Sequence, residues 1–135
     1  KGYNPISKYE MGMFLGKQWY KIQLKDKFVP NVNKPTNETL DVYILNKYIL
    51  EGILKIEDVR SEPDIKYLEG TKGAFGLARR VREGKALVAF NLYPVALEDL
   101  IKISDQGDFL PPKSTWIEPR MRNGFLAYLY KEVMK

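Results

Sequence analysis

Cationic side chains next to glycines form the pattern in this sequence that could do chemistry. In residues 67–80, YLEGTKGAFGLARR, the glycines Gly70 and Gly73 lie between an expected strand and an expected helix. Glycine lets main-chain N–H groups approach a ligand closely, and the start of a helix adds unpaired N–H groups with a partial positive charge. Lys72 and Arg79 would add full charges. The pattern predicts a site for a phosphate or carboxylate.

The same stretch also has a purely structural interpretation. It matches neither G-x-x-x-x-G-K-[ST] nor G-x-G-x-x-G, the two phosphate-loop motifs. A tight turn from strand to helix would use these glycines equally well, with Gly76 allowing close packing of the helix on the sheet. Arg79, Arg80 and Arg82 are most simply a solvated helix face, and Arg79 is the best anion ligand of the three because it lies nearest the start of the helix.

The second candidate is residues 109–124, FLPPKSTWIEPRMRNG. Its prolines stiffen the backbone on both sides of a short polar stretch, which flexible linkers do not do. Ammonium, hydroxyl, indole and carboxylate groups lie together there, as a small anionic or sugar-phosphate ligand would require. The residues concerned are Pro111, Pro112, Lys113, Ser114, Thr115, Trp116, Glu118 and Pro119.

This second stretch has an alternative as well. Trp116 could anchor the core, the hydroxyls of Ser114 and Thr115 could close a turn, and Glu118 could pair with an arginine. The chain contains no histidine and no cysteine, which removes the usual bases, nucleophiles and metal ligands. Ser114 has no base nearby except Lys113. We therefore predict no metal site and assign no cofactor or reaction, and whether the chain is an enzyme stays open.

The composition is that of an ordinary globular domain. The 135 residues suffice for a single domain with a core, and 22 basic against 17 acidic residues give a net charge of +5. That excess is too small to indicate a nucleic-acid-binding protein. No apolar run has the length of a membrane span and no signal peptide is evident, so a cytoplasmic location is expected. The chain begins Lys-Gly-Tyr, which suggests a piece of a longer protein.

The expected elements follow from hydrophobic periodicity and turn residues. A β-hairpin is expected within residues 1–25, with Gly16-Lys17 as its turn, and a mixed α/β body over residues 36–135 of the same domain (1–135). The body comprises a helix over 38–51 between a cap at Asn37 and a stop at Gly52, a strand over 65–70, a helix over 74–84, a strand within 85–94, a helix from Pro94 to Gly107, and a strand over 125–133.

These elements predict an α+β fold with a mixed sheet. The strand–helix–strand segment 65–94 has the length of a right-handed crossover, which would make its two strands parallel. The run 85–94 lacks alternation, which is typical of a central strand covered on both faces. The expected fold is a mixed parallel/antiparallel sheet with an N-terminal β-hairpin and about three helices packed on it.

Several of these stretches resemble one family. The segment PPKSTW at 111–116 followed by Glu118-Pro119, the strand end AFNLYP at 89–94, and the segment EDVRSEPDIKYLEGTKG at 57–73 are similar to the C-terminal part of the uncharacterised bacterial and archaeal domain-of-unknown-function 1015 family. Asn91, where that family's pattern leads us to expect an apolar residue, and Glu69, where it leads us to expect a glycine, depart from the pattern. The residues that fall on it include Asp58, Arg60, Pro111, Pro112, Trp116 and Pro119.

The resemblance implies a longer parent protein, roughly three times this length, of which this chain is the C-terminal domain. The N-terminal remainder would be its first partner, and its histidine-containing motif is not in this chain. Two functions follow as expectations. The domain contributes an anion-binding surface for a phosphate, nucleotide or carboxylate metabolite to a larger cytoplasmic enzyme. Alternatively, it is a non-catalytic module that packs on the remainder or on a copy of itself as a homodimer, using the aromatic residues Tyr9, Trp19, Tyr20, Tyr128 and Tyr130.

Overall fold

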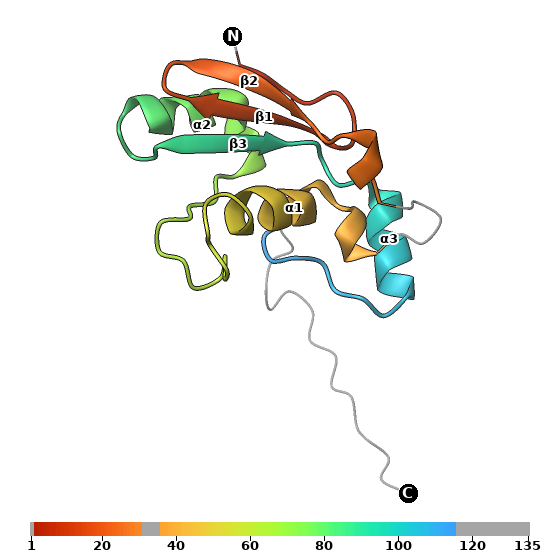
Figure 1. Cartoon of the computed structure of the whole chain (residues 1–135). Coiled ribbons are helices and arrows are strands. Elements are labelled where there is room, and N and C mark those ends of the chain that lie inside the picture. Colours follow the sequence, from red (N-terminus) through yellow and green to blue (C-terminus); the bar gives the residue numbers. More distant parts are fainter. Residues whose placement is uncertain (1, 31–35, 116–135) are drawn as a thin grey trace, which may run out of the picture.

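The N-terminal β-hairpin is present as predicted. The computed structural model describes residues 2–30 and 36–115, and Figure 1 shows their arrangement. Strands β1 (Glu10–Leu15) and β2 (Gln18–Gln23) pair antiparallel around the two-residue turn Gly16-Lys17. Gly16 has a φ of +63° and Lys17 does not have a positive φ. A glycine with positive φ at the first turn position is the pattern of a type II′ hairpin, whose twist matches that of the strands.

The other elements alternate between short helices and one more strand. In chain order they are the 3-10 helices η1 (Asp26–Phe28) and η2 (Asn37–Thr39), the α-helix α1 (Asp41–Ile44), the π-helix η3 (Leu45–Glu51), the 3-10 helix η4 (Gly70–Lys72), α2 (Gly73–Arg82), β3 (Val88–Leu92) and α3 (Leu97–Asp105). No helix among the described residues is both long and apolar enough to cross a membrane.

The expected parallel strand pair is wrong for the described part of the chain. Residues 65–70 form no strand, and β3 pairs antiparallel with β1, which gives a three-stranded sheet of order β2-β1-β3. Within that sheet β1 is central and β3 is an edge strand. Side chains of β3 pack toward both faces, so its unbroken apolar sequence reflects two-sided contact rather than a central position. Residues 65–70 instead belong to the connection from η3 to α2.

The sheet lies between two helical layers, which Figure 1 shows on its two sides. On the α1 face, defined by Met11, Met13 and Leu15 with their cross-strand neighbours, Met11 packs against Ile44 and Leu50. The opposite α2 face consists of Glu10, Gly12 and Phe14 with their neighbours. On this face Phe14 packs against Ala78 of α2 and Ala89 of β3, and the partly buried side chains around them are Trp19, Leu77 and Val81. Alternation along β1 therefore supplies both core clusters.

The predicted helix over 38–51 is present but changes its hydrogen bonding midway. The α-helix α1 continues directly into the π-helix η3, and Gly52 follows its last residue as predicted. Leu45 and Leu50 are both buried against Met11. Because a π-helix bonds residue i to i+5, it brings two leucines five positions apart onto one side. This packing accounts for the wider turns.

The helix boundaries were predicted with mixed success. Gly84 and Gly107 end α2 and α3 with positive φ values of +69° and +71°, as the sequence indicated. The cap predicted at Asn37 is wrong, because η2 and Leu40 intervene before α1. Asn37 instead donates from its main-chain N and its Nδ2 to the carboxylate of Asp108. The strand predicted over 125–133 lies outside the described residues.

Candidate functional site

The glycine turn, residues 70–73, leads into helix α2 but does not follow a strand, because residues 65–69 form none. Gly70 begins η4, and Gly73 begins α2 with φ +53° and ψ −167°, a combination that side chains rarely allow. A Cβ added to Gly70 or Gly73 would meet nothing within 4 Å, so the main chain faces open space there. The Nζ of Lys72 lies 3.0 Å from Oε2 of Glu69. The cation predicted to bind an anion is thus paired with its own neighbour.

The close packing of helix on sheet expected at Gly76 is wrong. A Cβ at this position would lie 2.8 Å from Cβ of Lys72 and 3.0 Å from Cδ2 of Leu68. The close contact is therefore with the segment that enters α2 and not with the sheet. Glycine at this position allows the chain to fold tightly from residue 68 into the helix.

The arginines of α2 do not point to one site. Nε of Arg79 donates to Oε1 of Glu83 at 2.6 Å, and Oε2 of Glu83 accepts from Lys85 at 2.8 Å. These two hydrogen bonds lower the pKa of Glu83 to about 2, and the bond from Lys85 has the larger effect. The guanidinium of Arg82 lies 5.1 Å from the centroid of the Phe14 ring, and Arg80 is exposed. Arg79 therefore belongs to an exposed charge cluster at the end of α2.

The described part of the proline-rich stretch closes a turn. The hydroxyl of Ser114 donates to the main-chain carbonyl of Pro111, and Lys113 has a φ of +60°. Lys113 and Thr115 are exposed, while Pro111 and Pro112 are half-buried. No hydrogen bond or ion pair joins residues 109–115 to the glycine turn within the described chain. Trp116, Glu118 and Pro119 lie outside the described residues, so a shared site stays a prediction.

Asp58 and Arg60, which carry part of the family resemblance, form a local turn. The carboxylate of Asp58 accepts from the main-chain N of Arg60 at 2.9 Å and from Oγ of Ser61 at 2.9 Å. These bonds lower the pKa of Asp58 below its ordinary value. The Arg60 side chain is exposed. The Asp58 carboxylate therefore fixes the local backbone conformation of this turn.

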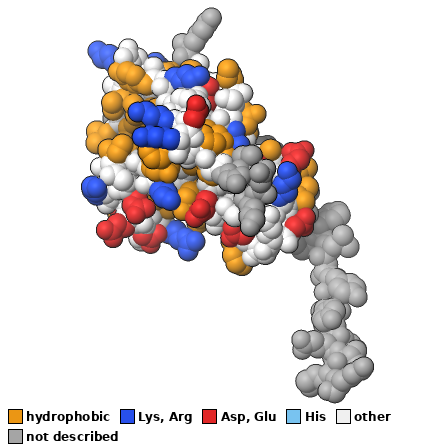
Figure 2. All heavy atoms as spheres, turned by 45° about the vertical axis from the view of Figure 1, so that its right-hand side comes forward, with side chains coloured by type: hydrophobic (Ala, Val, Ile, Leu, Met, Phe, Trp, Pro, Cys, Tyr) orange, Lys and Arg blue, Asp and Glu red, His pale blue; other side chains and the backbone are white. Residues whose placement is uncertain are grey.

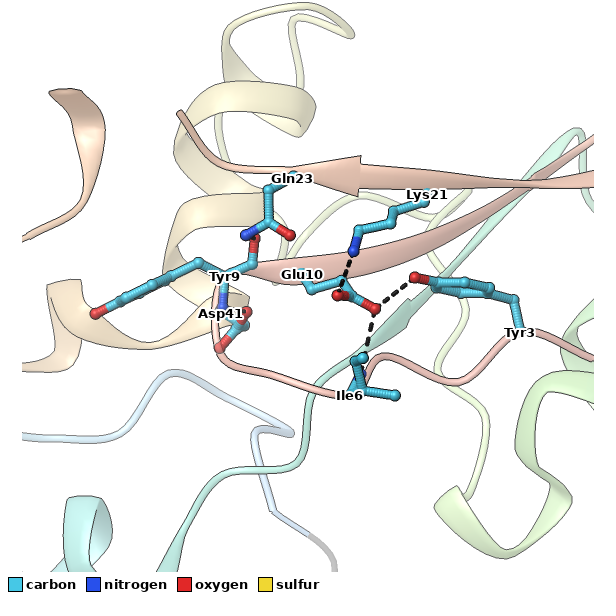
Figure 3. Close-up of polar contacts among 7 residues, drawn as sticks. All are labelled: Tyr3, Ile6, Tyr9, Glu10, Lys21, Gln23 and Asp41. Atoms are coloured by element: carbon cyan, nitrogen blue, oxygen red, sulfur yellow. Dashed lines mark hydrogen bonds and ion pairs between the residues drawn. The ribbon is translucent and has the colours of Figure 1, made fainter. Parts of the chain in front are cut away.

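A buried carboxylate that sequence reasoning missed lies on the α2 face (Figure 3). Glu10 of β1 is 1% exposed. Its carboxylate accepts from the phenol of Tyr3, from the main-chain N of Ile6 at 3.2 Å and from Nζ of Lys21 at 2.8 Å. The bond from Lys21, followed by that from Tyr3, lowers the pKa of Glu10 to about 2. The same hydrogen bond between Tyr3 and Glu10 raises the pKa of the Tyr3 phenol to about 12.

Residues 2–6, the N-terminal strap, lie across this face and supply most of these contacts. Nδ2 of Asn91 donates to the carbonyl of Tyr3 at 2.8 Å and to Oδ1 of Asn4 at 3.1 Å. A Cβ at Gly12 would lie 2.7 Å from the Tyr3 ring and 3.1 Å from the Trp19 ring. Gly12 thus provides the space in which the Tyr3 ring lies.

A second buried carboxylate, Asp41 of α1, holds the turn between the strap and β1. Asp41 is 5% exposed, and its Oδ1 accepts from the main-chain N of Tyr9 at 2.7 Å. Burial raises the pKa of Asp41 to about 6, against the opposing effects of that bond and of Lys8. Lys8 pairs with Asp99 of α3 at 2.9 Å. Tyr9 has a φ of +67°, and its buried hydroxyl has no hydrogen-bond partner among the described residues.

A cleft of about 180 Å³ lies beside η3, and aromatic rings form much of its wall. Nζ of Lys47 lies 5.5 Å from the ring centroid of Tyr43 and 5.9 Å from that of Tyr48. This volume is below the roughly 300 Å³ at which small-molecule sites begin. The cleft therefore accommodates no more than a small group. Its lining residues are Phe28, Pro30, Glu38, Tyr43, Ile44, Lys47 and Tyr48.

The surface charge has no single focus. On the face shown in Figure 2, lysine and arginine side chains are interspersed with acidic and apolar ones. Five cations of the described residues are paired with carboxylates: Lys8, Lys21, Lys72, Arg79 and Lys85. No group of three or more acidic side chains that could hold a metal ion is found in residues 2–30 and 36–115.

Comparison with known proteins gives no family for this chain. No protein-family model matches it, no curated protein is significantly similar to it, and no solved structure matches its fold. The resemblance to the domain-of-unknown-function 1015 family therefore stays a prediction. Any functional conclusion must rest on the geometry described above.

Proposed function

We propose that this domain is a non-catalytic interaction module that binds another polypeptide through the turn end of its α1 face. The surface concerned is the turn-end patch, defined as Met13, Leu15, Tyr20, Val88 and Phe90 on the α1 face together with Leu87, the residue that precedes β3. Leu87 is 90% exposed, Leu15 46% and Tyr20 41%. Large apolar side chains that are exposed together commonly mark interaction surfaces. This exposure is the observation that carries the proposal.

The strand register makes the patch continuous. Met13 of β1 lies directly between Tyr20 of β2 and Phe90 of β3, and in the next row Leu15 lies beside Val88. Side chains directly opposite each other in a sheet are in contact, and diagonal ones are within reach of aromatic rings. None of the patch residues is charged. An apolar centre containing an aromatic residue is typical of interface cores.

Two charged residues close to the patch in sequence suit the rim of an interface. Lys17 lies in the hairpin turn two residues after Leu15, and Lys85 precedes Leu87 by two residues. Both are exposed, and Lys85 is held by Glu83 at 2.8 Å. Polar residues around an apolar centre are the usual arrangement of a non-obligate interface. The partner we propose is the remainder of a longer parent protein or a second copy of this chain.

The double variant Leu15→Ser, Leu87→Ser tests the patch, because exposed positions can be changed with little effect on the fold. If the partner is a second copy, the wild-type chain associates with rising concentration in light scattering after size exclusion, and the double variant stays monomeric. Leu97→Ser on α3 is the matched control, since Leu97 is also exposed. Association that the double variant leaves unchanged would contradict the proposal. A monomeric wild-type chain would leave the other polypeptide as partner, to be tested by the same variants in the longer protein.

An anion-binding surface at the glycine turn is the second candidate function. It is supported by the open space at Gly70 and Gly73 and by their position at the start of the ten-residue helix α2. The pairing of Lys72 with Glu69 weakens it, because an anion would compete with that carboxylate. Titration with inorganic phosphate, followed by thermal unfolding, tests it. Stabilisation that Lys72→Ala and Lys113→Ala both abolish would support a shared site, and stabilisation that neither variant changes would contradict it.

A further inference from the structure

The N-terminal strap is bound to the α2 face in the way that a peptide ligand is bound. Residues 2–6 belong to no strand, so no ladder of main-chain hydrogen bonds holds them. They are fixed instead by specific groups of the sheet, among which Asn91 donates to the Tyr3 carbonyl and Glu10 accepts from the Tyr3 phenol and from the Ile6 N–H. Side-chain recognition of an extended segment is a property of a binding groove rather than of a sheet.

The groove contains a slot that is shaped for one aromatic ring. Gly12 forms its floor, because any Cβ there would lie 2.7 Å from the Tyr3 ring. Trp19 forms one side, with its ring centroid 6.5 Å from that of Tyr3. Glu10 lies where the phenol oxygen ends, and Lys21 holds the carboxylate from the other side. The floor, the side and the polar end of the slot all belong to the paired strands β1 and β2.

The strap is followed by a turn, residues 7–10, that can act as its hinge. The N–H of Glu10 donates to the carbonyl of Ser7 at 3.3 Å, and Tyr9 within that turn has a positive φ of +67°. Positive φ in a residue other than glycine is a strained conformation. Lys8 and Tyr9 are anchored to Asp99 and Asp41. Residues 2–6 can therefore leave the groove while the turn and the two anchors stay in place.

We propose that this groove is a binding site for an extended polypeptide segment that carries an unmodified tyrosine, and that residues 2–6 occupy it in cis. The tyrosine ring of the ligand enters the slot over Gly12, its hydroxyl donates to Glu10, and its main-chain carbonyl accepts from Asn91. The Glu10 carboxylate rejects phosphotyrosine, because two negative charges would meet in a buried site. The groove lies on the opposite face of the sheet from the turn-end patch and is independent of it.

The strap competes with such a ligand because it is attached to the same chain. A tethered segment has an effective concentration on the order of millimolar, so a free peptide of equal intrinsic affinity binds the wild-type chain weakly. The Tyr3→Ala variant empties the slot and leaves Gly12, Trp19, Glu10 and Asn91 in place. Removal of the competing ring is expected to make peptide binding at least about tenfold tighter.

The test uses a fluorescein-labelled peptide of residues 1–8, KGYNPISK, added to the full chain and followed by fluorescence anisotropy. Saturable binding to the Tyr3→Ala chain, tighter than to the wild-type chain, is the expected result. Peptides with phenylalanine or phosphotyrosine in place of the tyrosine should bind more weakly, the second one least. No binding to Tyr3→Ala, or equal binding of the three peptides, overturns the proposal.

The matched control is the double variant Tyr3→Ala, Gly12→Ala. Without the Tyr3 ring the added methyl group no longer meets its nearest neighbour, so the chain folds, but the slot is filled and the peptide should not bind. Equal binding to the single and double variants places the peptide elsewhere and refutes the groove. If Tyr3→Ala does not fold, the wild-type chain serves in its place. Excess peptide must then shift the NMR signals of the Gly12 amide and the Trp19 indole, and unchanged signals refute the groove as well.

Discussion

The side-chain amide of Asn91 donates a 2.8 Å hydrogen bond to the main-chain carbonyl of Tyr3 and so joins the edge strand β3 to the N-terminal strap. Position 91 is where the family resemblance expects an apolar residue. The difference has a structural reason, because the neighbour of Asn91 on the α2 face is a carbonyl group and not a hydrophobic side chain. An apolar residue there would leave that carbonyl without its donor.

Replacement of Asn91 by leucine is therefore expected to destabilise the fold by about 1 kcal/mol, the net value of a typical intramolecular hydrogen bond. Urea unfolding of the two chains measures the difference. Asn4→Ala is the control, because Asn4 is exposed and accepts only the second, 3.1 Å bond from the same amide. A larger loss for Asn4→Ala than for Asn91→Leu would show that the carbonyl bond is unimportant.

Gly12→Ala should displace the Tyr3 ring, because the new methyl group would lie 2.7 Å from it. Overpacking of this kind costs about 1–3 kcal/mol. The expected sign is a loss of stability in denaturant unfolding, and the loss should shrink when Tyr3 is also changed to alanine. This coupling is the decisive measurement, since two residues in contact are not additive. Additive effects would mean that the ring and Gly12 do not touch in solution.

The glycine turn can be tested by two matched substitutions. Gly73→Ala is expected to destabilise the chain by about 1–3 kcal/mol because of its positive φ, although nothing within 4 Å would clash with the methyl group. Gly70→Ala should have almost no effect, since Gly70 has the same open surroundings and no positive φ. Thermal or urea unfolding compares the two variants. Equal losses of stability in the two variants would contradict the role of the positive φ at Gly73.

Asp41 should make stability depend on pH between about 4 and 6. Its pKa is raised from 3.8 to about 6 in the folded chain, so the folded state holds this proton more tightly than the unfolded state. The contribution is fully present below the unfolded value and is lost as pH rises through about 6. Asp41→Asn keeps an oxygen acceptor for the Tyr9 N–H and removes the titration.

The measurement is the difference in unfolding free energy between the wild-type chain and Asp41→Asn across this pH range. The wild-type chain should lose stability relative to the variant by about 2–3 kcal/mol at most on going from pH 4 to pH 7, from a shift of about two pKa units. Other titrating groups, Glu10 among them, affect both chains alike and cancel in the difference. A constant difference would mean that Asp41 is solvated in the folded chain.

Sequence reasoning succeeded where the determining contacts are local. The hairpin follows from alternation on both sides of Gly16-Lys17, and the ends of α2 and α3 follow from Gly84 and Gly107. Each of these features is decided within a few residues of the chain. The existence of a helix over 38–51 was predicted for the same reason, although the π-helical form of its second half was not.

The sequence could not show features that depend on distant partners. The antiparallel pairing of β1 with β3 places Met11 beside Leu92. No local sequence pattern favours this pairing over the parallel one that we expected between β3 and residues 65–70. The sequence assigns no role to Glu10, because its burial depends on Tyr3 and Lys21 from two other segments. The only local signal for the burial of Glu10 is its position in the strand: it directly precedes Met11 and therefore faces the opposite side of the sheet.

The π-helix η3 contains one residue more than an α-helix would need to place the same leucines against the core. In an α-helix each residue turns about 100° around the axis, so positions 45 and 50 would lie about 140° apart. Leu45 and Leu50 both face the core only because the wider turns absorb one additional residue. Deletion of an exposed residue between them, Lys47 or Tyr48, would restore α-helical turns and leave both leucines inward. This is a segment of the helix from Asp41 to Glu51 that can be shortened by one residue without turning a core leucine toward water.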